Sequence, residues 1–371
     1  MMGHEKALLA VALAATVASA ASAERLAVMQ FGGAWRHVES SEFKSAPAPP
    51  TKILRGSGGG IEFRIRYDDV EQDTGIGFDD PAEGATRRAT LEAVLVHLDS
   101  ILDNNGVLDV AALASENSGS ATLATGSTYY RVINGFTGGL SLERLTTGVD
   151  QFPEIPDMQI TVNFGATWNS GIGHPRVDQY DLFTVLLHEA AHGLGVASLT
   201  TSQGSSAIQS GTSPTFTFSN YDKLLFAASG SRLWDGSPPT IQVPASVLAG
   251  GQGAAFLCAS NVGGSIGFCP GIHTPTRFVQ GSSISHWDSS ARQDGAPALM
   301  TPAIPRNYAN RTFRRFERAL LRDLGYTLAP GALDDPARGI VDRVLGMAAG
   351  GTDLNLDGKL DCSDIARART P

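Results

Sequence analysis

One stretch of the chain joins an apolar helical pattern to residues that bind metals. It reads TVLLHEAAHGLGVAS over residues 184–198, and its two histidines, His188 and His192, stand four positions apart. An α-helix has 3.6 residues per turn, so both rings leave the same face, one turn above the other. Neutral imidazole is a good zinc ligand, and two rings leave room for a third protein ligand and a water. The spacing therefore predicts a metal-binding helix.

The carboxylate between these histidines indicates hydrolytic chemistry. Glu189 directly follows the first histidine. In helices with the pattern H-E-x-x-H, this glutamate is the general base that takes a proton from a zinc-bound water. The alternative is an ordinary helix that carries the pattern by coincidence. We favour the metal site because the stretch is apolar on nearly every side, and a buried glutamate without a partner would be costly.

A glycine after the second histidine adds a constraint. Gly195 lies three residues beyond His192 and can adopt positive φ, so it lets the chain end the helix and turn beneath the metal. HEAAHGLG matches the first part of the metzincin signature, in which a third histidine lies three residues after the glycine. Here that position is Ser198, and serine is not a usual zinc ligand. Either the site is incomplete or the third donor comes from elsewhere.

Two downstream histidines are candidates for the missing ligand. His286 lies in SHWD, and Met300 follows it fourteen positions later in ALMTP. His273, in GIHTPTRF, lacks both the Trp-acid partner and a nearby methionine, so we favour His286. Asp288 is a candidate for orienting a histidine ring by accepting its second N–H group, and the alternative is an ordinary surface carboxylate.

The order of these motifs resembles that of the leishmanolysin family of metzincin zinc proteases. In that family the third histidine is displaced by an inserted segment and is followed by a methionine turn and a closing helix, here LMTP and RALLRDLGY. The resemblance covers residues 184–198 and 284–326. It implies zinc ligands at His188, His192 and His286, the general base at Glu189, the helix-ending glycine at Gly195 and a methionine beneath the ligands at Met300. The family is rich in cysteine and this chain is not, so its substrate preference is not transferred.

The fold expected around this site is α+β. IEFRIRYDD, from Ile61, alternates apolar and polar residues and predicts a half-buried strand. ATRRATLEAVLVHLDSILD has leucines and valines at helical spacing and predicts a long helix, in which His97 is a surface or internally bonded residue. MQITVNF, over 158–164, predicts a strand that is a candidate for pairing with extended substrate. We expect a metzincin-like domain over 61–330, with a twisted mixed sheet and a cleft.

The loops around the metal-binding helix hold further candidates. Asp178 is the predicted N-cap of that helix, and Asp181 adds a favourable negative charge in its first turn. His174, in the same loop, is expected to be solvated. Tyr308, after Met300, is a candidate for donating a hydrogen bond to the oxyanion of the reaction, and the alternative is a packed aromatic.

The N-terminus has the organisation of a secretory signal peptide over residues 1–23. A short charged segment ends at Lys6, an apolar run begins at Ala7, and Ala21-Ser22-Ala23 provides a small-residue cleavage site. The run is too short and alanine-rich to indicate a membrane span, although an uncleaved anchor is the alternative. We expect a secreted protein, extracellular or periplasmic. Residues 24–60 are rich in Pro, Ser and Gly and are expected to be a propeptide or linker.

Composition agrees with an acidic globular enzyme. The chain has 371 residues and a formal net charge of -9, and it lacks the Lys/Arg cluster that nucleic acid would require. Its three cysteines are too few for a disulfide scaffold. Cys258 and Cys269 are close enough to form one disulfide in an oxidising compartment, the alternative being two free thiols, and Cys362 stands apart. The segment over 199–282 is expected to be an insertion with its own local structure.

The C-terminal residues 331–371 predict a separate calcium-binding module. A short helix begins at Asp335, and DLNLDGKLDCSD follows it with the spacing of a calcium loop. The expected calcium ligands are Asp353, Asn355, Asp357, Lys359 through its carbonyl, Asp361 and Asp364. The loop resembles a single dockerin repeat. Dockerins that bind cohesins use two repeats, so we expect a structural calcium site rather than docking.

Two functions fit this sequence. The favoured one is a secreted zinc endopeptidase, with Zn2+ and Ca2+ as cofactors and with proteins or peptides as substrates. The other is a non-catalytic calcium-binding adhesion or surface module whose metal site is only structural. They differ in the effect of Glu189→Gln, which abolishes peptide cleavage only in the first case.

Overall fold

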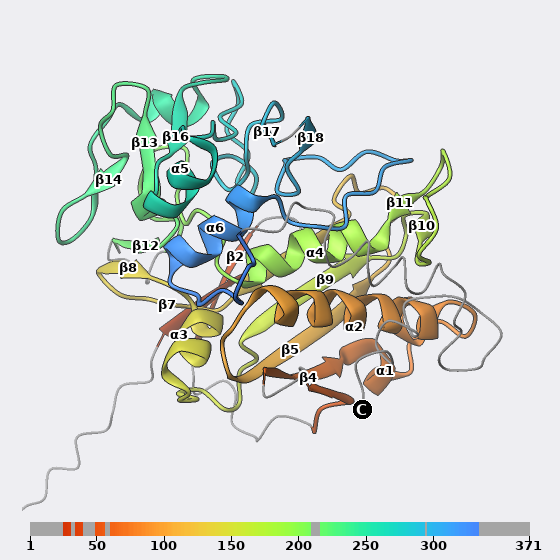
Figure 1. Cartoon of the computed structure of the whole chain (residues 1–371). Coiled ribbons are helices and arrows are strands. Elements are labelled where there is room, and N and C mark those ends of the chain that lie inside the picture. Colours follow the sequence, from red (N-terminus) through yellow and green to blue (C-terminus); the bar gives the residue numbers. More distant parts are fainter. Residues whose placement is uncertain are drawn as a thin grey trace, which may run out of the picture.

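The computed structural model describes residues 25–30, 34–39, 49–55, 60–208, 216–293 and 295–333. Within these ranges the chain has the expected α+β fold, with a mixed five-stranded sheet and six α-helices (Figure 1). No helix among the described residues is both long and apolar enough to cross a bilayer. The predicted signal peptide and the predicted calcium ligands Asp353, Asn355, Asp357, Lys359, Asp361 and Asp364 lie outside the described residues.

The central sheet has the strand order β3-β4-β5-β9-β6. Strand β4 (Ile61–Tyr67) is parallel to β5 (Gly106–Ser115), which is parallel to β9 (Met158–Asn163). The outer strands β3 (Lys52–Arg55) and β6 (Ala124–Thr128) are antiparallel to their neighbours. Burial alternates along β4, as its period-two pattern predicts.

Two long helices pack against this sheet and against each other. They are α2 (Gly84–Ile101), which is the predicted long helix, and α4 (Leu182–Gly193), which carries the two histidines (Figure 1). Every residue of α4 is buried, because the helix lies between α2, β6 and β9. His97 of α2 lies near the rings of Phe183 and Phe313, with centroid distances of 6.4 and 6.5 Å. It is therefore a core residue.

Strand β9 does not have the edge position that pairing with a substrate requires. It is hydrogen-bonded to β5 on one side and to β6 on the other, so its backbone groups are already used. Our prediction for this strand was wrong. Its six residues are all buried, as befits an interior strand, and the sheet ends at β3 on one side and at β6, which packs against α4, on the other. The sequence of β6, ATGST, has no apolar alternation that would have indicated this position.

Residues before Ile61, expected to form a propeptide or linker, contribute three strands to the folded domain. Strand β1 (Arg25–Met29) pairs with β2 (Trp35–Glu39) and with β7 (Tyr130–Arg131), while β3 extends the central sheet. Leu26 and Ala27 of β1 are fully buried. The folded region thus begins N-terminal to the boundary that we expected at Ile61.

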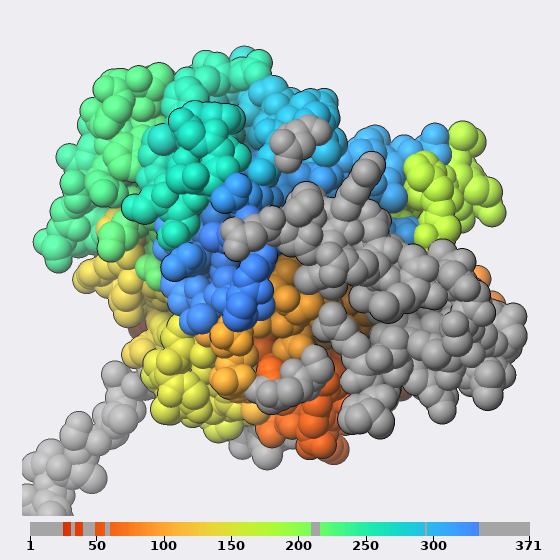
Figure 2. All heavy atoms as spheres, in the orientation of Figure 1, coloured from red at the N-terminus to blue at the C-terminus, as the bar shows by residue number. Residues whose placement is uncertain are grey.

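The insertion between α4 and His286 has its own local structure, as predicted. Strands β13 (Leu225–Ala227) and β16 (Ala255–Leu257) pair with each other, and α5 (Ser260–Ile266) packs on α6 (Arg315–Leu324). Cys258 and Cys269 form a disulfide. In Figure 2 the described residues of the insertion, coloured green to teal, lie at the upper left of the molecule, and the orange residues lie below them.

Short elements complete the described part of the chain. The helices are α1 (Asp68–Gln72) and α3 (Leu140–Thr147), with single helical turns η2 (Gly77–Asp79), η3 (Asp222–Leu224) and η4 (Ala245–Ala249). The strands form small two-stranded pairs: β8 (Gly135–Thr137) with β12 (Thr217–Ser219), β10 (Trp168–Asn169) with β11 (Tyr180–Asp181), β14 (Trp234–Asp235) with β15 (Thr240–Ile241), and β17 (Arg292–Gln293) with β18 (Ala296–Pro297). The pair β10 and β11 leads directly into α4.

Candidate metal centre

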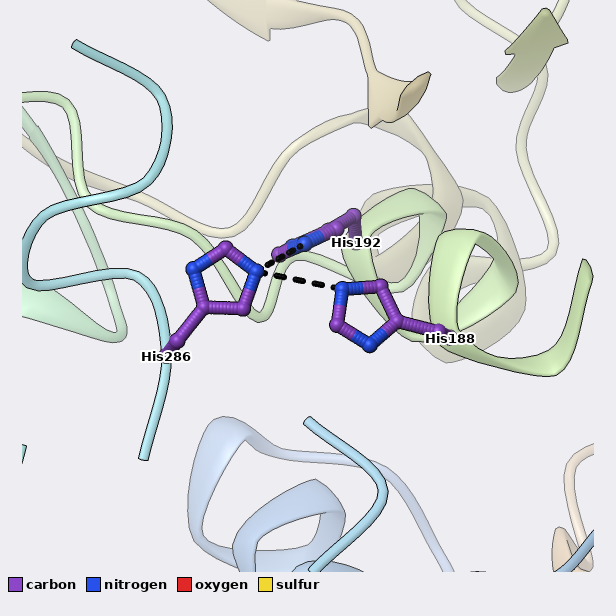
Figure 3. A group of neighbouring side chains, drawn as sticks. All are labelled: His188, His192 and His286. Carbon is purple, nitrogen blue, oxygen red and sulfur yellow. Dashed lines mark hydrogen bonds between the residues drawn. The ribbon is translucent and has the colours of Figure 1, made fainter. Parts of the chain in front are cut away.

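The three histidines that we predicted to meet do so at one point. Nε2 of His286 lies 3.1 Å from Nε2 of His188 and 3.2 Å from Nε2 of His192 (Figure 3). All three rings are buried, and they are the one group of three or more His, Cys, Asp or Glu side chains in the described ranges that is compact enough to hold a metal ion. His286, and not His273, is therefore the third member of the group.

Asp181 places the first two histidines by capping α4. Its carboxylate accepts hydrogen bonds from the backbone N–H of Thr184 at 3.0 Å and from the Thr184 hydroxyl at 2.6 Å. Asp178, our predicted N-cap, is exposed and forms an ion pair with Arg176 instead. That prediction was wrong by three residues, because strand β11 continues to Asp181 and delays the start of the helix.

The second nitrogen of each ring contacts a backbone carbonyl. Nδ1 of His188 lies 3.1 Å from the carbonyl oxygen of Leu299, while the corresponding distances are 2.6 Å from His192 to Val196 and 2.8 Å from His286 to Ser282. Carbonyl oxygens only accept, so these contacts assign the proton of each neutral ring to Nδ1. Each Nε2 is then left with a lone pair, and the three lone pairs repel one another unless a cation lies between them.

The geometry and protonation of the group fit a zinc ion. Tetrahedral coordination with Zn–N bonds of about 2.0–2.1 Å separates ligand nitrogens by roughly 3.3–3.4 Å, close to the observed 3.1 and 3.2 Å. Burial lowers the pKa of His188 to about 3 and that of His192 to about 4, and it holds the pKa of His286 well below its usual value. The rings are thus neutral at neutral pH, as ligands must be.

Glu189 lies in a tight contact between α4 and the edge strand β6. Burial raises the pKa of its carboxyl group to about 8, and a hydrogen bond from the backbone N–H of Gly126 acts in the opposite direction. A Cβ atom on Gly126 would lie 1.9 Å from the carbonyl oxygen of Glu189, so only glycine allows this approach. Sequence reasoning missed Gly126, because a lone glycine in ATGST carries no motif.

The chain leaves α4 as the glycine pattern predicts. Gly195 has a φ of 88°, in the left-handed region, and a Cβ atom there would meet the carbonyl oxygen of Gly138 at 3.0 Å. Ser198, at the position where the signature has histidine, is buried. Its backbone N–H instead donates to the hydroxyl of Ser285 at 3.1 Å, directly before His286.

A buried carboxylate organises the turn that contains Met300. Oε1 of Glu317, on α6, accepts hydrogen bonds from the backbone N–H groups of Leu299 and Met300, both at 2.9 Å, and from the indole of Trp287 at 3.1 Å. The backbone N–H of Trp287 donates to the carbonyl of Met300 at 2.8 Å. The turn and the segment that carries His286 are thus held together. We missed Glu317 because a charged residue in an amphipathic helix normally faces solvent.

The remaining candidate side chains lie outside the three-histidine group. His273 contacts His286 through the backbone, its N–H donating to the His286 carbonyl at 2.8 Å. Asp288 accepts hydrogen bonds from Gln252 and Ser290, while the three rings contact carbonyls. Neither of the two roles considered for Asp288 holds, because it orients none of these rings and its side chain is buried rather than at the surface. His174 is exposed. Tyr308 is half-buried, and burial raises its pKa.

Comparisons with known proteins do not assign this chain to a family. No family model, no curated protein and no solved structure matches it. The chemical assignment therefore depends on the geometry of the histidine group and on the residues around it.

Proposed function

We propose that the protein is a secreted zinc-dependent endopeptidase of the metzincin type, resembling the leishmanolysin family, with Glu189 as its general base. The observation that carries this proposal is the convergence of His188, His192 and His286 through three unprotonated nitrogens. Each of these rings is fixed by a backbone carbonyl, and the glutamate of the same motif is buried on the same helix.

The number of protein ligands favours a catalytic site over a structural one. Structural zinc sites usually have four protein ligands, whereas catalytic sites have three and leave a position for water or substrate. No fourth His, Cys, Asp or Glu joins the group in the part of the chain that the structure describes. This supports the endopeptidase over the alternative of a surface module with a structural metal.

The mechanism assigns the proton transfers to Glu189. His188, His192 and His286 would hold the zinc ion, which would supply the Lewis acidity that activates water and polarises the scissile carbonyl. The Glu189 carboxylate accepts the proton of the attacking water and returns it to the nitrogen of the leaving amine. Burial keeps the pKa of Glu189 near 8 in the absence of a cation, and a nearby positive charge lowers that pKa and favours the basic carboxylate.

Strand β6 is the element that we propose aligns the substrate. It lies at the edge of the sheet beside α4, and its Gly126 N–H reaches the carboxylate of Glu189. An extended peptide can add to a free sheet edge through backbone hydrogen bonds that do not depend on its sequence. Substrates would then bind along β6 in an extended conformation, a role that the interior strand β9 is unable to perform.

We also propose secretion and a structural calcium site. Secretion is supported by the signal-peptide pattern over residues 1–23 and by the disulfide between Cys258 and Cys269, which is typical of an oxidising compartment. The calcium site is supported by the spacing of acidic residues over 353–364.

The decisive test compares Glu189→Gln with a matched variant, Glu92→Gln, which alters a buried carboxyl group on α2. We expect all three proteins to carry one zinc per chain. Wild type and Glu92→Gln should cleave an unstructured protein such as casein, whereas Glu189→Gln should be slower by at least about 100-fold. A zinc-containing wild type that cleaves no peptide would favour the structural metal site, and undiminished cleavage by Glu189→Gln would remove this residue from the mechanism.

A further inference from the structure

The third histidine, His286, is separated from the two histidines of α4 by a long insertion in the sequence. The chain departs from the site at Ser198 and Leu199 and returns at Ile284 and Ser285, with the insertion over 199–282 between these points. A third ligand next to the helix would be placed by the local backbone alone. Here the segment that leaves the site at Ser198 and the segment that returns at Ile284 must be fixed to each other before His286 can lie near the histidines of α4.

Two consecutive residues of the insertion bond to both of these points. The hydroxyl of Tyr221 donates to the carbonyl oxygen of Ile284 at 3.0 Å. Oδ2 of Asp222 accepts a hydrogen bond from the backbone N–H of Leu199, also at 3.0 Å. Both side chains are buried. The dipeptide thus joins the point where the chain leaves the site to the point where it returns.

The dipeptide is itself held rigidly. Asp222 accepts a hydrogen bond from the backbone N–H of Ser219 at 2.9 Å and donates its own backbone N–H to the Ser219 hydroxyl at 3.0 Å. The hydroxyl of Ser219 also contacts the carbonyl oxygen of Ala197 at 2.6 Å. A third connection joins the two points directly, because the N–H of Ser198 donates to the hydroxyl of Ser285. These bonds are buried, so water does not compete for them.

The backbone at Ile284 has a conformation that needs such support. Its φ is 70°, in the left-handed region that a β-branched residue rarely adopts. The residue is fully buried, and its N–H donates to the carbonyl of His273 at 2.8 Å while its own carbonyl accepts from Tyr221. This unusual turn redirects the chain two residues before His286, so its conformation determines the direction from which the third ring approaches.

We propose that Tyr221, Asp222 and Ser285 are positioning residues. They connect the segment that leaves α4 to the segment that carries His286 and so hold His286 in place for metal binding. The proposal rests on the proposed function, because it requires that the three histidines bind a metal. It makes the insertion a part of the metal centre. When one of these bonds is lost, the segment from Ile284 to His286 becomes more mobile, and the third ligand leaves the metal more often.

The test measures metal release from the zinc-loaded full chain. Tyr221→Phe removes one hydroxyl and leaves the ring in the core. Tyr129→Phe is the matched control, because its buried hydroxyl donates to Oε1 of Gln159 at 3.1 Å, in a separate apolar cluster. We expect zinc transfer to an excess of a coloured chelator to be on the order of tenfold faster in Tyr221→Phe. Tyr129→Phe should release zinc at the wild-type rate, although both variants lose one buried hydrogen bond.

A spectroscopic measurement separates positioning from general loosening. The visible absorption of cobalt-substituted protein reports the coordination geometry, and we expect the intense tetrahedral bands to weaken in Tyr221→Phe and not in Tyr129→Phe. A wild-type release rate together with an unchanged cobalt spectrum in Tyr221→Phe would overturn the proposed positioning role and leave the proposed function intact. A wild-type protein that binds neither zinc nor cobalt would overturn both.

A second pair of variants covers the case in which Tyr221→Phe does not fold. Ser285→Ala removes the acceptor for the Ser198 N–H. Its control is Ser141→Ala, which removes a buried hydroxyl that donates to the carbonyl of Asp157 at 2.9 Å. Zinc release that is several-fold faster in Ser285→Ala alone supports the proposal, and equal rates in these two variants contradict it.

Discussion

Nδ1 of His188 lies 3.1 Å from the carbonyl oxygen of Leu299, the residue that precedes Met300. A ring on α4 is therefore oriented by a turn more than a hundred residues away in sequence. Leu299 also donates its backbone N–H to the carboxylate of Glu317 on α6. The candidate metal centre thus depends on contacts among α4, the turn around Met300 and α6, as well as on the insertion.

Glu317→Gln should destabilise the protein. The carboxylate accepts hydrogen bonds from the N–H groups of Leu299, Met300 and Arg314 and from the indole of Trp287. Glutamine has an NH2 group, which donates, in place of one carboxylate oxygen, which accepts. One buried N–H group therefore loses its acceptor, at a cost of about 1–3 kcal/mol.

Urea denaturation of the metal-free protein measures this effect, with the exposed Glu71→Gln as the control. We expect the control to change the free energy of unfolding by less than about 0.5 kcal/mol. Equal stability of Glu317→Gln and wild type would mean that the carboxylate does not hold the turn.

Gly126→Ala should damage both the fold and the activity. The added Cβ atom would lie 1.9 Å from the carbonyl oxygen of Glu189, so β6 and α4 must separate. We expect a loss of about 1–3 kcal/mol of stability, typical of overpacking, and a loss of peptide cleavage. Gly264→Ala in α5, where a Cβ atom meets nothing within 4 Å, is the control and should fold and cleave like wild type. Thermal denaturation and a casein assay decide between these outcomes.

Acid should lower the free energy of unfolding of the metal-free protein. Burial lowers the pKa of His188 to about 3 and that of His192 to about 4, both below the unfolded value of 6.5. Between these values the unfolded chain binds more protons than the folded chain does. The contribution of these rings to stability is therefore complete above pH 6.5 and is lost as the pH falls toward 3.

For the same reason, protons should not displace the metal until the solution is well below pH 6. Zinc content after dialysis at pH 7, 6 and 5 checks this prediction, and we expect the metal to be retained at all three values. Release centred on pH 6.5, the ordinary value for histidine, would show that the rings are not buried as a neutral group.

The calcium loop, which lies outside the described residues, remains a prediction from the sequence. The full chain should bind one calcium ion in calorimetric titration, and Asp357→Ala should abolish this binding because it removes a carboxylate ligand from the loop. Zinc content should stay unchanged, since the three histidines lie elsewhere in the sequence. Calcium binding that survives Asp357→Ala would place the site in another part of the chain.

The sequence predicted the parts of the site that depend on local periodicity. The spacing of His188 and His192 required a helix, and Gly195 adopted the positive φ for which glycine is suited. The contacts that fix the rings escaped prediction because they involve backbone carbonyls, which every residue has. Glu317 and Tyr221 escaped for a related reason, since their roles depend on burial and on partners distant in sequence.

Sheet order was the least predictable part of the fold. The apolar run of β9 correctly indicated a strand, yet such a run is typical of interior strands, and the edge position went to the polar strand β6. The N-terminal strands β1, β2 and β3 were missed because strands of four or five residues are too short to show a periodicity. The prediction of His286 over His273 succeeded because it used neighbouring residues as well as ring chemistry.

Zinc content is the most direct test of the central claim that the three histidines hold one metal ion. It should be measured in purified wild type, His286→Ala and His273→Ala, with circular dichroism to establish that each is folded. We expect one zinc per chain in wild type and in His273→Ala, and little zinc in His286→Ala, because two imidazoles alone hold zinc weakly. Wild-type protein without zinc, or full zinc in His286→Ala and none in His273→Ala, would contradict the account.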